Sequence, residues 1–407
     1  MRKHLLPLWL TVPLFIQCNN SVAPSEDRHA RNLTSLEKRI VASNNSFGLN
    51  LFRQVNASEY NNNVFISPLS VSMALAMTLN GANGATLDSM QRALAFTGIS
   101  PQEINETYLS LIGLFIQLDP QVKFQIANSI WYRNTFSVEG AFIDLNRQYF
   151  NAEVRSLDFA SVSAADIING WVDVNTNGKI KSIIDPPIPD NMMMYLINAI
   201  YFKGTWTYEF KKDQTKDDYF NGPGGVRLPC RMMSHKAKHR YGVVDNVQVL
   251  DLAYGNADYG MTVLLPGPGT DVEAFISSLD RDLLGHLADS LQEQDVSVFL
   301  PMFRLEYKKT LNQVLSAMGM GIAFSDWADF TKINRQGRLC ISEVKHKTFV
   351  VVNEEGTEAA AVTSVGIGVT SGPSTPVFRA DRPFVFAIRE NKSGTILFIG
   401  KIVLPAL

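Results

Sequence analysis

The chain lacks the sequence features of several common protein classes. Only 3 of its 407 residues are cysteines, too few for a disulfide framework. No CxxC, HExxH or GxSxG motif occurs, so the usual signatures of zinc sites and of serine hydrolases are missing. The formal net charge is only −2, which gives no electrostatic argument for binding nucleic acid or an acidic membrane. These absences favour an ordinary globular protein without a metal cofactor.

Long hydrophobic runs are also missing, except at the N-terminus. Arg2, Lys3 and His4 precede an apolar run from Leu5 to Ile16, which is too short to span a bilayer as a helix. This pattern predicts a signal peptide over residues 1–18 and a secreted, extracellular protein. A second reading, lipid anchoring through Cys18, is less favoured because Gln17 stands where a lipoprotein signal needs a small residue.

Polar residues with mixed charge follow, and we interpret residues 19–43 as a flexible lead-in. Beyond Cys18 the chain has only Cys230 and Cys340. We expect two buried free thiols, with a single disulfide as the alternative.

From residue 44 onward, helix and strand signals alternate without an internal repeat. A helix is expected from near Ser46, and a second from Pro68, with Ser67 as its N-terminal cap. Further helices are predicted over Ala164–Lys181 and Thr310–Gly319. Strands are predicted over Phe124–Trp131, Met194–Phe202, Tyr259–Pro266, Val296–Phe303 and Thr348–Asn353, with two more within Val385–Val403. The sequence thus predicts one large α+β domain over residues 44–407.

Residues 354–377 do not fit this pattern. A connection of this length is uncommon in a compact domain, and its alanine, threonine and valine content is not that of an ordinary linker. Alternate residues from Thr357 are small or apolar and uncharged, as in a strand with one buried face. That set is Thr357, Ala359, Ala361, Thr363, Val365 and Ile367. The segment is compatible both with an exposed loop and with a strand, and a simple solvated loop stays open on this segment alone.

Several motifs, in the same order along the chain, resemble those of the serpin family. Asn63–Ser70 is similar to the entry into the family's helix B, and Asn198–Trp206 to its central strand. Asn353–Ala360 is similar to the hinge of the reactive loop, and Phe378–Phe384 followed by Gly394–Gly400 to the C-terminal signature.

The resemblance implies a serpin fold with three β-sheets, about nine helices and an exposed reactive-centre loop over about 354–377. It also implies a metastable, non-enzymatic inhibitor of serine proteases. The protease cuts the loop and forms a covalent acyl-enzyme, and the freed loop inserts into the main sheet. The resemblance further assigns three groups of residues. They are a hinge of Glu354, Gly356, Thr357, Glu358, Ala359, Ala360 and Ala361, a "shutter" of Ser67, Ser70, Asn198 and His346, and a "breach" around Trp206.

The cleaved bond can be placed by counting along the family pattern. Seventeen residues from Glu354 place the cut after Thr370, before Ser371, whereas counting back from Pro383 gives Gly372. We favour the first count, because the inserted length is mechanically constrained, and keep Val369 as the nearest alternative. An uncharged, small Thr370 favours elastase-like or subtilisin-like proteases over trypsin-like ones.

The family resemblance also bears on partners. The helix near 86–98 holds Arg92 against Asp88, so heparin binding there is not expected. We expect no cofactor and a monomer that could form loop–sheet polymers. A catalytic pairing of His346 with Ser67 or Ser70 is disfavoured against the shutter. A non-inhibitory serpin, acting as carrier, chaperone or protease substrate, stays open as an alternative, although the small hinge residues favour an inhibitor.

Overall fold

A computed structural model of the chain describes residues 31–357 and 375–406, and these contain nine α-helices and fifteen strands. The helices are α1 (Ser35–Ala57), α2 (Pro68–Leu79), α3 (Gly84–Ala93), α4 (Pro101–Gln117), α5 (Gly140–Phe150), α6 (Ala164–Asn175), α7 (Val272–Ser278), α8 (Arg281–Asp289) and α9 (Asn312–Leu315). The α+β class predicted from the sequence is confirmed.

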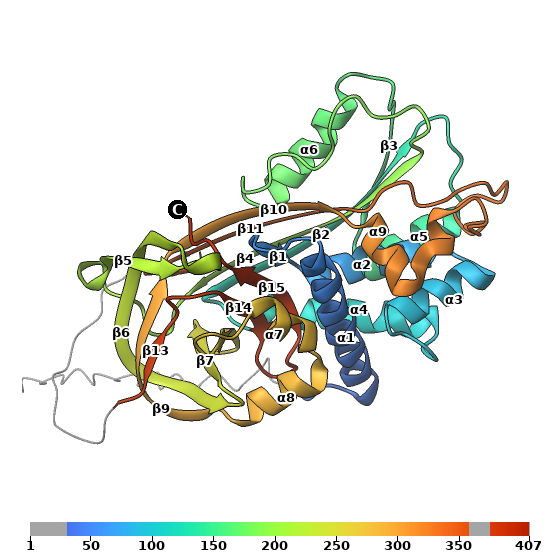
Figure 1. The fold of residues 1–407 in the computed structure, drawn as a ribbon. Coiled ribbons are helices and arrows are strands. Elements are labelled where there is room, and N and C mark those ends of the chain that lie inside the picture. The colour runs from blue at the N-terminus through green and yellow to red at the C-terminus, as the bar shows by residue number, and fades with distance from the viewer. Residues whose placement is uncertain (1–30, 358–374, 407) are drawn as a thin grey trace, which may run out of the picture. The chain divides into compact units, whose positions relative to one another are not determined.

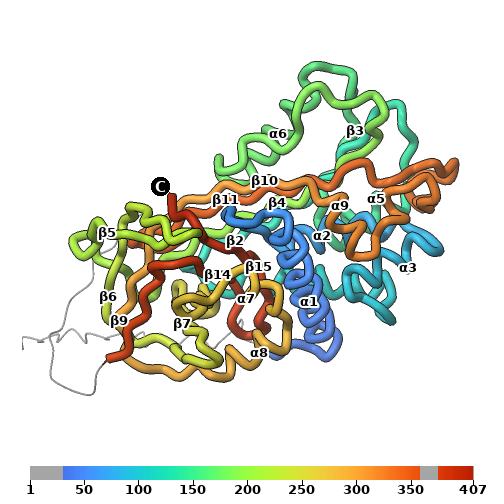
Figure 2. Tube along the Cα trace, in the orientation of Figure 1, coloured from blue at the N-terminus to red at the C-terminus, as the bar shows by residue number. Residues whose placement is uncertain are grey.

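The smaller of two hydrogen-bonded strand networks is a six-stranded sheet. Its order is β10 (Phe303–Thr310), β11 (Lys345–Asn353), β12 (Gly356–Thr357), β4 (Met194–Thr205), β2 (Val122–Arg133) and β3 (Glu153–Leu157). Segments apart in the sequence therefore lie side by side, as the tube in Figure 2 shows for β10 and β11.

The larger network has nine strands and contains two parts joined through one long strand. Its order is β1 (Val64–Ile66), β15 (Ile396–Ile402), β14 (Phe384–Glu390), β8 (Tyr259–Pro266), β7 (Val247–Tyr254), β6 (Arg227–Val244), β9 (Gln292–Pro301) and β13 (Val377–Arg379), with β5 (Lys216–Asn221) also on β6. The start of β6 pairs with β5, its middle with β9 and its end with β7. The three expected sheets are therefore the six-stranded one and these two linked parts.

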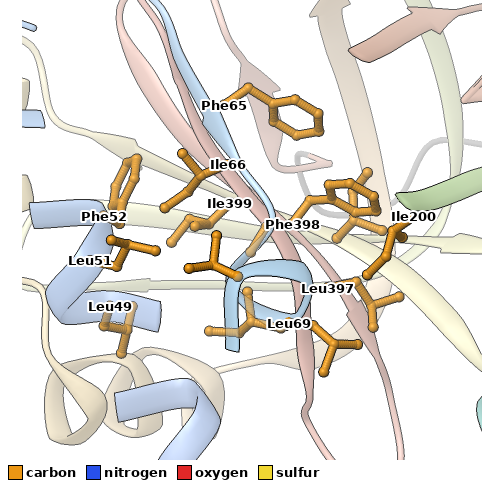
Figure 3. Packing of buried hydrophobic residues seen from close by; sticks show 14 of the residues in the cluster. Leu49, Leu51, Phe52, Phe65, Ile66, Leu69, Ile200, Leu397, Phe398 and Ile399 are labelled. Atoms are coloured by element: carbon orange, nitrogen blue, oxygen red, sulfur yellow. The ribbon is translucent and has the colours of Figure 1, made fainter. Parts of the chain in front are cut away.

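Helices cover both faces of the six-stranded sheet. In Figure 1, α6 lies on one side of β2 and β4, and α1 and α2 lie on the other. Beneath α6, Ile168 and Val172 join Trp131, Tyr195 and Ile197 in a small apolar cluster. The main core lies on the other side, where side chains of α1, β1, α2, β4 and β15 meet (Figure 3). A strand such as β4, covered on both faces, reads as a nearly continuous apolar run.

The first helix begins earlier than the sequence pattern indicated. Residues 35–43 are helical, so the flexible lead-in predicted over 19–43 is wrong for that part. Thr34 Oγ1 accepts a hydrogen bond from the Glu37 N–H at 3.2 Å, and the Thr34 N–H donates to Glu37 Oε2 at 2.7 Å. This is a capping box, and Thr34 followed by Glu37 is the signal that would have located the start.

Three other boundaries differ from those predicted. The strand over Val296–Phe303 is two strands, β9 and β10, separated at Met302. The helix predicted over Thr310–Gly319 begins later, because β10 runs to Thr310, and α9 is then followed by a π-helical turn over Ser316–Met320 and a 3-10 turn over Gly321–Phe324, with Gly319 at φ of 104° inside. α6 ends at Asn175, followed by the left-handed residues Asn177 and Gly178. An Asn-Gly pair is a common helix stop, so this end was readable from the sequence.

Cys230 and Cys340 are free thiols, as expected, but neither is buried: Cys230 is half-buried and Cys340 is exposed. The partial loss of solvent around each thiol nevertheless raises the pKa of both. Across residues 31–357 and 375–406, no group of three or more His, Cys, Asp or Glu side chains could hold a metal ion. The helices of the same ranges are all too short or too polar to cross a bilayer.

Candidate functional site

The six-stranded sheet has a gap between its two central long strands. β4 and β11 are joined only at one end, through the two residues of β12. Thr357 lies opposite Val352 of β11 and Gly204 of β4. Among the described residues, β4 and β11 form no ladder with each other. At β12 the two strands have one strand between them, which places them about 9.6 Å apart there, the width of one additional strand.

The hinge residues at the closed end of this gap are buried and hydrogen-bonded. The backbone N–H of Trp206 donates to the Glu355 carbonyl, and the Trp206 indole N–H donates to the Asn353 carbonyl, both at 3.0 Å. The Glu354 carboxylate accepts from the Thr215 hydroxyl at 2.8 Å, and Glu355 pairs with Lys212 at 2.6 Å. The predicted breach residue Trp206 therefore contacts the predicted hinge directly.

The surroundings of Gly356 and Thr357 explain why these two residue types form β12. Gly356 has φ of 150°, and a Cβ there would lie 2.1 Å from the Gly204 carbonyl oxygen, so only glycine fits. Thr357 is 3% exposed, and its hydroxyl lies 2.5 Å from the Tyr254 hydroxyl. Tyr254 in turn stacks on Trp206 with ring centroids 4.5 Å apart. Thr357, the first of the hinge side chains expected to face the core after insertion, is therefore already buried in the gap.

Ser67, Ser70, Asn198 and His346 form a polar cluster beside the gap. Ser67 caps α2 by accepting from the Ser70 N–H at 3.2 Å, and its hydroxyl donates to the Leu397 carbonyl at 2.7 Å. His346 Nε2 accepts from the Ser67 backbone N–H at 3.0 Å. The Ser70 hydroxyl is 3.4 Å from the Asn198 carbonyl, a weak contact. One turn of α2 thereby links β15, β11 and β4.

This geometry does not form a Ser–His nucleophile. The Ser67 hydroxyl donates its proton to a carbonyl, and His346 contacts the backbone N–H of Ser67 rather than its hydroxyl. Burial lowers the pKa of His346 to about 4, so the imidazole is neutral at pH 7. A general base must reach the proton that it removes, and His346 does not reach the Ser67 hydroxyl proton.

Two buried histidines and one half-buried histidine predict a steep loss of stability in acid. Burial lowers the pKa of His235, His239 and His346 to about 4, 3 and 4, from 6.5. Below about pH 6.5 the unfolded chain therefore binds more protons than the folded one, and the free energy of unfolding falls with pH. We expect a loss on the order of 5 kcal/mol between pH 7.5 and 5, measured from urea unfolding midpoints.

The matched variants for this measurement are His239→Phe and His286→Gln. The first removes a buried histidine and should flatten the pH dependence, whereas the second changes an exposed one and should not. An equal pH dependence in all three proteins would contradict the assignment.

Part of the predicted site lies outside the described residues. This holds for the hinge residues Glu358, Ala359, Ala360 and Ala361, for the predicted bond between Thr370 and Ser371 with its alternatives Val369 and Gly372, and for the signal peptide and Cys18. The helix expected near 86–98 is α3, in which Arg92 is the only basic residue.

Sequence reasoning missed three residues that contact the site. Asn198 Nδ2 donates to Asn128 Oδ1 at 2.7 Å, and the polar pair Asn128-Ser129 lies between apolar residues of β2, which is a readable signal. Lys212, the partner of Glu355, lies in a run of mixed charge that favoured a solvated face. Nothing in the sequence marks Tyr254, because its contacts with Trp206 and Thr357 arise only in the fold.

Comparison with known proteins gives one consistent result. The family described as "Serpin (serine protease inhibitor)" matches residues 42–405. Leukocyte elastase inhibitor of Sus scrofa is 37% identical over 381 residues, covering 90% of this chain and all of that protein.

Solved structures agree with the sequence comparison. The thermophilic serpin tengpin in its native state has a TM-score of 0.83 and 33% identity, covering 92% of this chain and 95% of that one. Human thyroxine-binding globulin complexed with its hormone has a TM-score of 0.84 and 28% identity, covering 92% of this chain and all of that one.

Proposed function

The chain belongs to the family described as serine protease inhibitors, the serpins, and we propose that it inhibits serine proteases as a single-use suicide substrate rather than acting as an enzyme. In this proposal the protease cuts the segment after the hinge and is trapped as a covalent acyl-enzyme. The cut segment then enters the six-stranded sheet between β4 and β11.

The observation that carries the proposal is the one-strand gap next to a hinge already paired with both of its edges. Thr357 pairs with β11 and with β4, so a strand that kept this pairing beyond Thr357 would run along the gap. Fourteen residues from Thr357 to Thr370 would extend about 45 Å at a rise of roughly 3.3 Å per residue. The twelve residues of β4 extend about 40 Å by the same measure. The segment therefore has the length needed to pair along the whole of β4.

For the target we propose elastase-like or subtilisin-like serine proteases, with cleavage after Thr370. The small uncharged Thr370 suits a shallow primary pocket, and a relative of this chain is named for inhibition of leukocyte elastase.

Incubation with elastase, subtilisin, chymotrypsin and trypsin should give a complex stable on a denaturing gel with the first two. Mass spectrometry of the released C-terminal fragment should show Ser371 as its first residue. A cut outside Val369–Gly372, or rapid trapping of trypsin alone, would disprove the target assignment. Cleavage by every protease without any stable complex would instead support the alternative of a non-inhibitory member.

We further propose that residues 1–18 direct the chain out of the cell and are removed. The support is the basic start at Arg2 followed by the apolar run Leu5–Ile16. Mass spectrometry of the protein purified from the medium of its host should find an N-terminus after residue 18 and no lipid on Cys18. Recovery of the protein with Met1 intact from the cell interior would contradict this.

A further inference from the structure

Two histidines of the long strand β6 point the same ring nitrogen at each other. His235 and His239 lie on one face of the strand, with the small side chain of Ala237 between them on that face. Residues four apart in a strand are about 13 Å apart along it, so the two side chains must lean toward each other to meet. Their Nε2 atoms are 2.9 Å apart, and the rings are nearly parallel, with centroids separated by 5.0 Å.

A backbone group holds each ring from its other side. His235 Nδ1 lies 3.4 Å from the Glu209 carbonyl oxygen, and the backbone of Asp251 on the neighbouring strand β7 hydrogen-bonds the His239 ring. A carbonyl oxygen accepts hydrogen bonds and cannot donate them, so the ring proton belongs on the nitrogen that faces the backbone, and the two Nε2 lone pairs face each other. Histidines that bind metal ions are commonly oriented in this way, by a carbonyl on the nitrogen that does not bind.

Aromatic side chains fix the position of the histidine pair. Phe210 stacks on His235 with ring centroids 3.9 Å apart, and Tyr208 meets His239 edge-on at 5.7 Å. His239 is buried, whereas His235 is half-buried and remains open to solvent on one side. Burial lowers the pKa of His235 to about 4 and that of His239 to about 3, so at pH 7 both rings are neutral and no proton competes for their lone pairs.

The separation of the two nitrogen atoms distinguishes between metal ions. Two nitrogens that each bind an ion at about 2.0–2.1 Å are about 2.9 Å apart when the angle at the ion is 90°, and about 3.3–3.4 Å apart when it is tetrahedral. The observed 2.9 Å therefore matches adjacent positions of a square-planar site rather than the tetrahedral site of zinc. Cu²⁺ and Ni²⁺ take square-planar geometry and accept imidazole, and Cu²⁺ generally binds the more tightly of the two.

We propose that His235 and His239 bind one Cu²⁺ ion through their Nε2 atoms, in adjacent positions of a square-planar site. Across residues 31–357 and 375–406 no third His, Cys, Asp or Glu side chain joins this pair, so water from the open side of His235 fills the two remaining positions. An ion held by two protein ligands exchanges with the medium, unlike a structural metal, which usually has four. The binding rests on this pair alone and is independent of the proposed inhibition of proteases.

Titration of the full chain, purified without a histidine tag, with CuCl₂ against a chromogenic chelator tests the affinity. We expect binding of Cu²⁺ at least tenfold tighter than that of Zn²⁺ measured in the same way. Binding of Cu²⁺ should weaken at least tenfold in His235→Gln and in His239→Gln. His286 is exposed and lies outside the pair, so His286→Gln should bind like the wild type. Equal Cu²⁺ affinities in these four proteins, or tighter binding of Zn²⁺ by the wild type, would overturn the proposal.

Electron paramagnetic resonance of the wild-type protein with one equivalent of Cu²⁺ tests the geometry without relying on any variant. We expect a tetragonal spectrum with two bound imidazole nitrogens. Pulsed measurements should detect the two remote Nδ1 atoms, because each ring binds the ion through Nε2 alone. In His235→Gln the signal of one or both imidazoles should be lost. A wild-type spectrum without bound imidazole, or an identical spectrum in His235→Gln, would show adventitious copper elsewhere on the chain and overturn the site.

Discussion

Replacing Thr357 with arginine should convert the protein from an inhibitor into a substrate. Thr357 is 3% exposed and begins the set of residues that would face the core after insertion. Because this position is buried in the gap before cleavage, an arginine there must either carry an unpaired charge into the gap, which costs several kcal/mol, or keep the hinge out of it. Either outcome slows insertion, so the competing hydrolysis of the acyl-enzyme should win. We expect more than about tenfold more cleaved chain per trapped protease, measured by stoichiometric titration and denaturing gels.

Two variants separate the buried charge from the lost hydrogen bond. Tyr254→Phe removes the hydroxyl that contacts Thr357, and Thr357→Ser keeps a hydroxyl at the hinge. Both should remain inhibitors with a stoichiometry close to that of the wild type. If Thr357→Arg also keeps that stoichiometry, the strand does not enter the gap and the inhibitory mechanism is wrong.

Cleavage of the segment after the hinge should raise the melting temperature by about 10–25 °C. Counting one net hydrogen bond for each of the fourteen inserted residues, at about 0.5–1.5 kcal/mol each, gives about 7–20 kcal/mol in total. Unfolding of a chain of this length has an entropy of about 0.8 kcal/mol per kelvin, which converts this gain into the expected shift. Differential scanning calorimetry of intact and cleaved protein measures it directly.

The control for this experiment is Thr357→Arg cleaved at the same bond. Its melting temperature should rise much less than that of the cleaved wild type, because the buried charge opposes insertion. Indistinguishable melting curves for intact and cleaved wild-type protein would point to a non-inhibitory member of the family.

Local patterns predicted the elements that are covered on both faces or marked by a cap. β8 spans Tyr259–Pro266 as predicted, and α2 begins at Pro68 behind Ser67. These elements carry their signal within a few residues, as an apolar run or as a Ser-Pro start. The predicted start of α1 is wrong because it follows the apolar face near Phe47, whereas the helix begins behind the polar capping box at Thr34.

Only those parts of the site that carry a family motif could be predicted from the sequence. Ser67, Ser70, Asn198 and His346 were placed in one cluster by resemblance, and the structure brings them together. The gap between β4 and β11 could not be read from the sequence. Strand pairing between residues about 150 positions apart depends on the whole topology, which no local period encodes.

Ser67 joins three elements of the fold, and substitutions at this residue would show how much the fold depends on it. Its backbone N–H, its hydroxyl proton and its hydroxyl oxygen each serve a different element, β11, β15 and α2. Even alanine would remove the last two at once, and proline would remove the first. A carrier of such a change would produce less folded protein. The loss would arise at the start of a buried helix, far along the chain from the segment that a protease would cut.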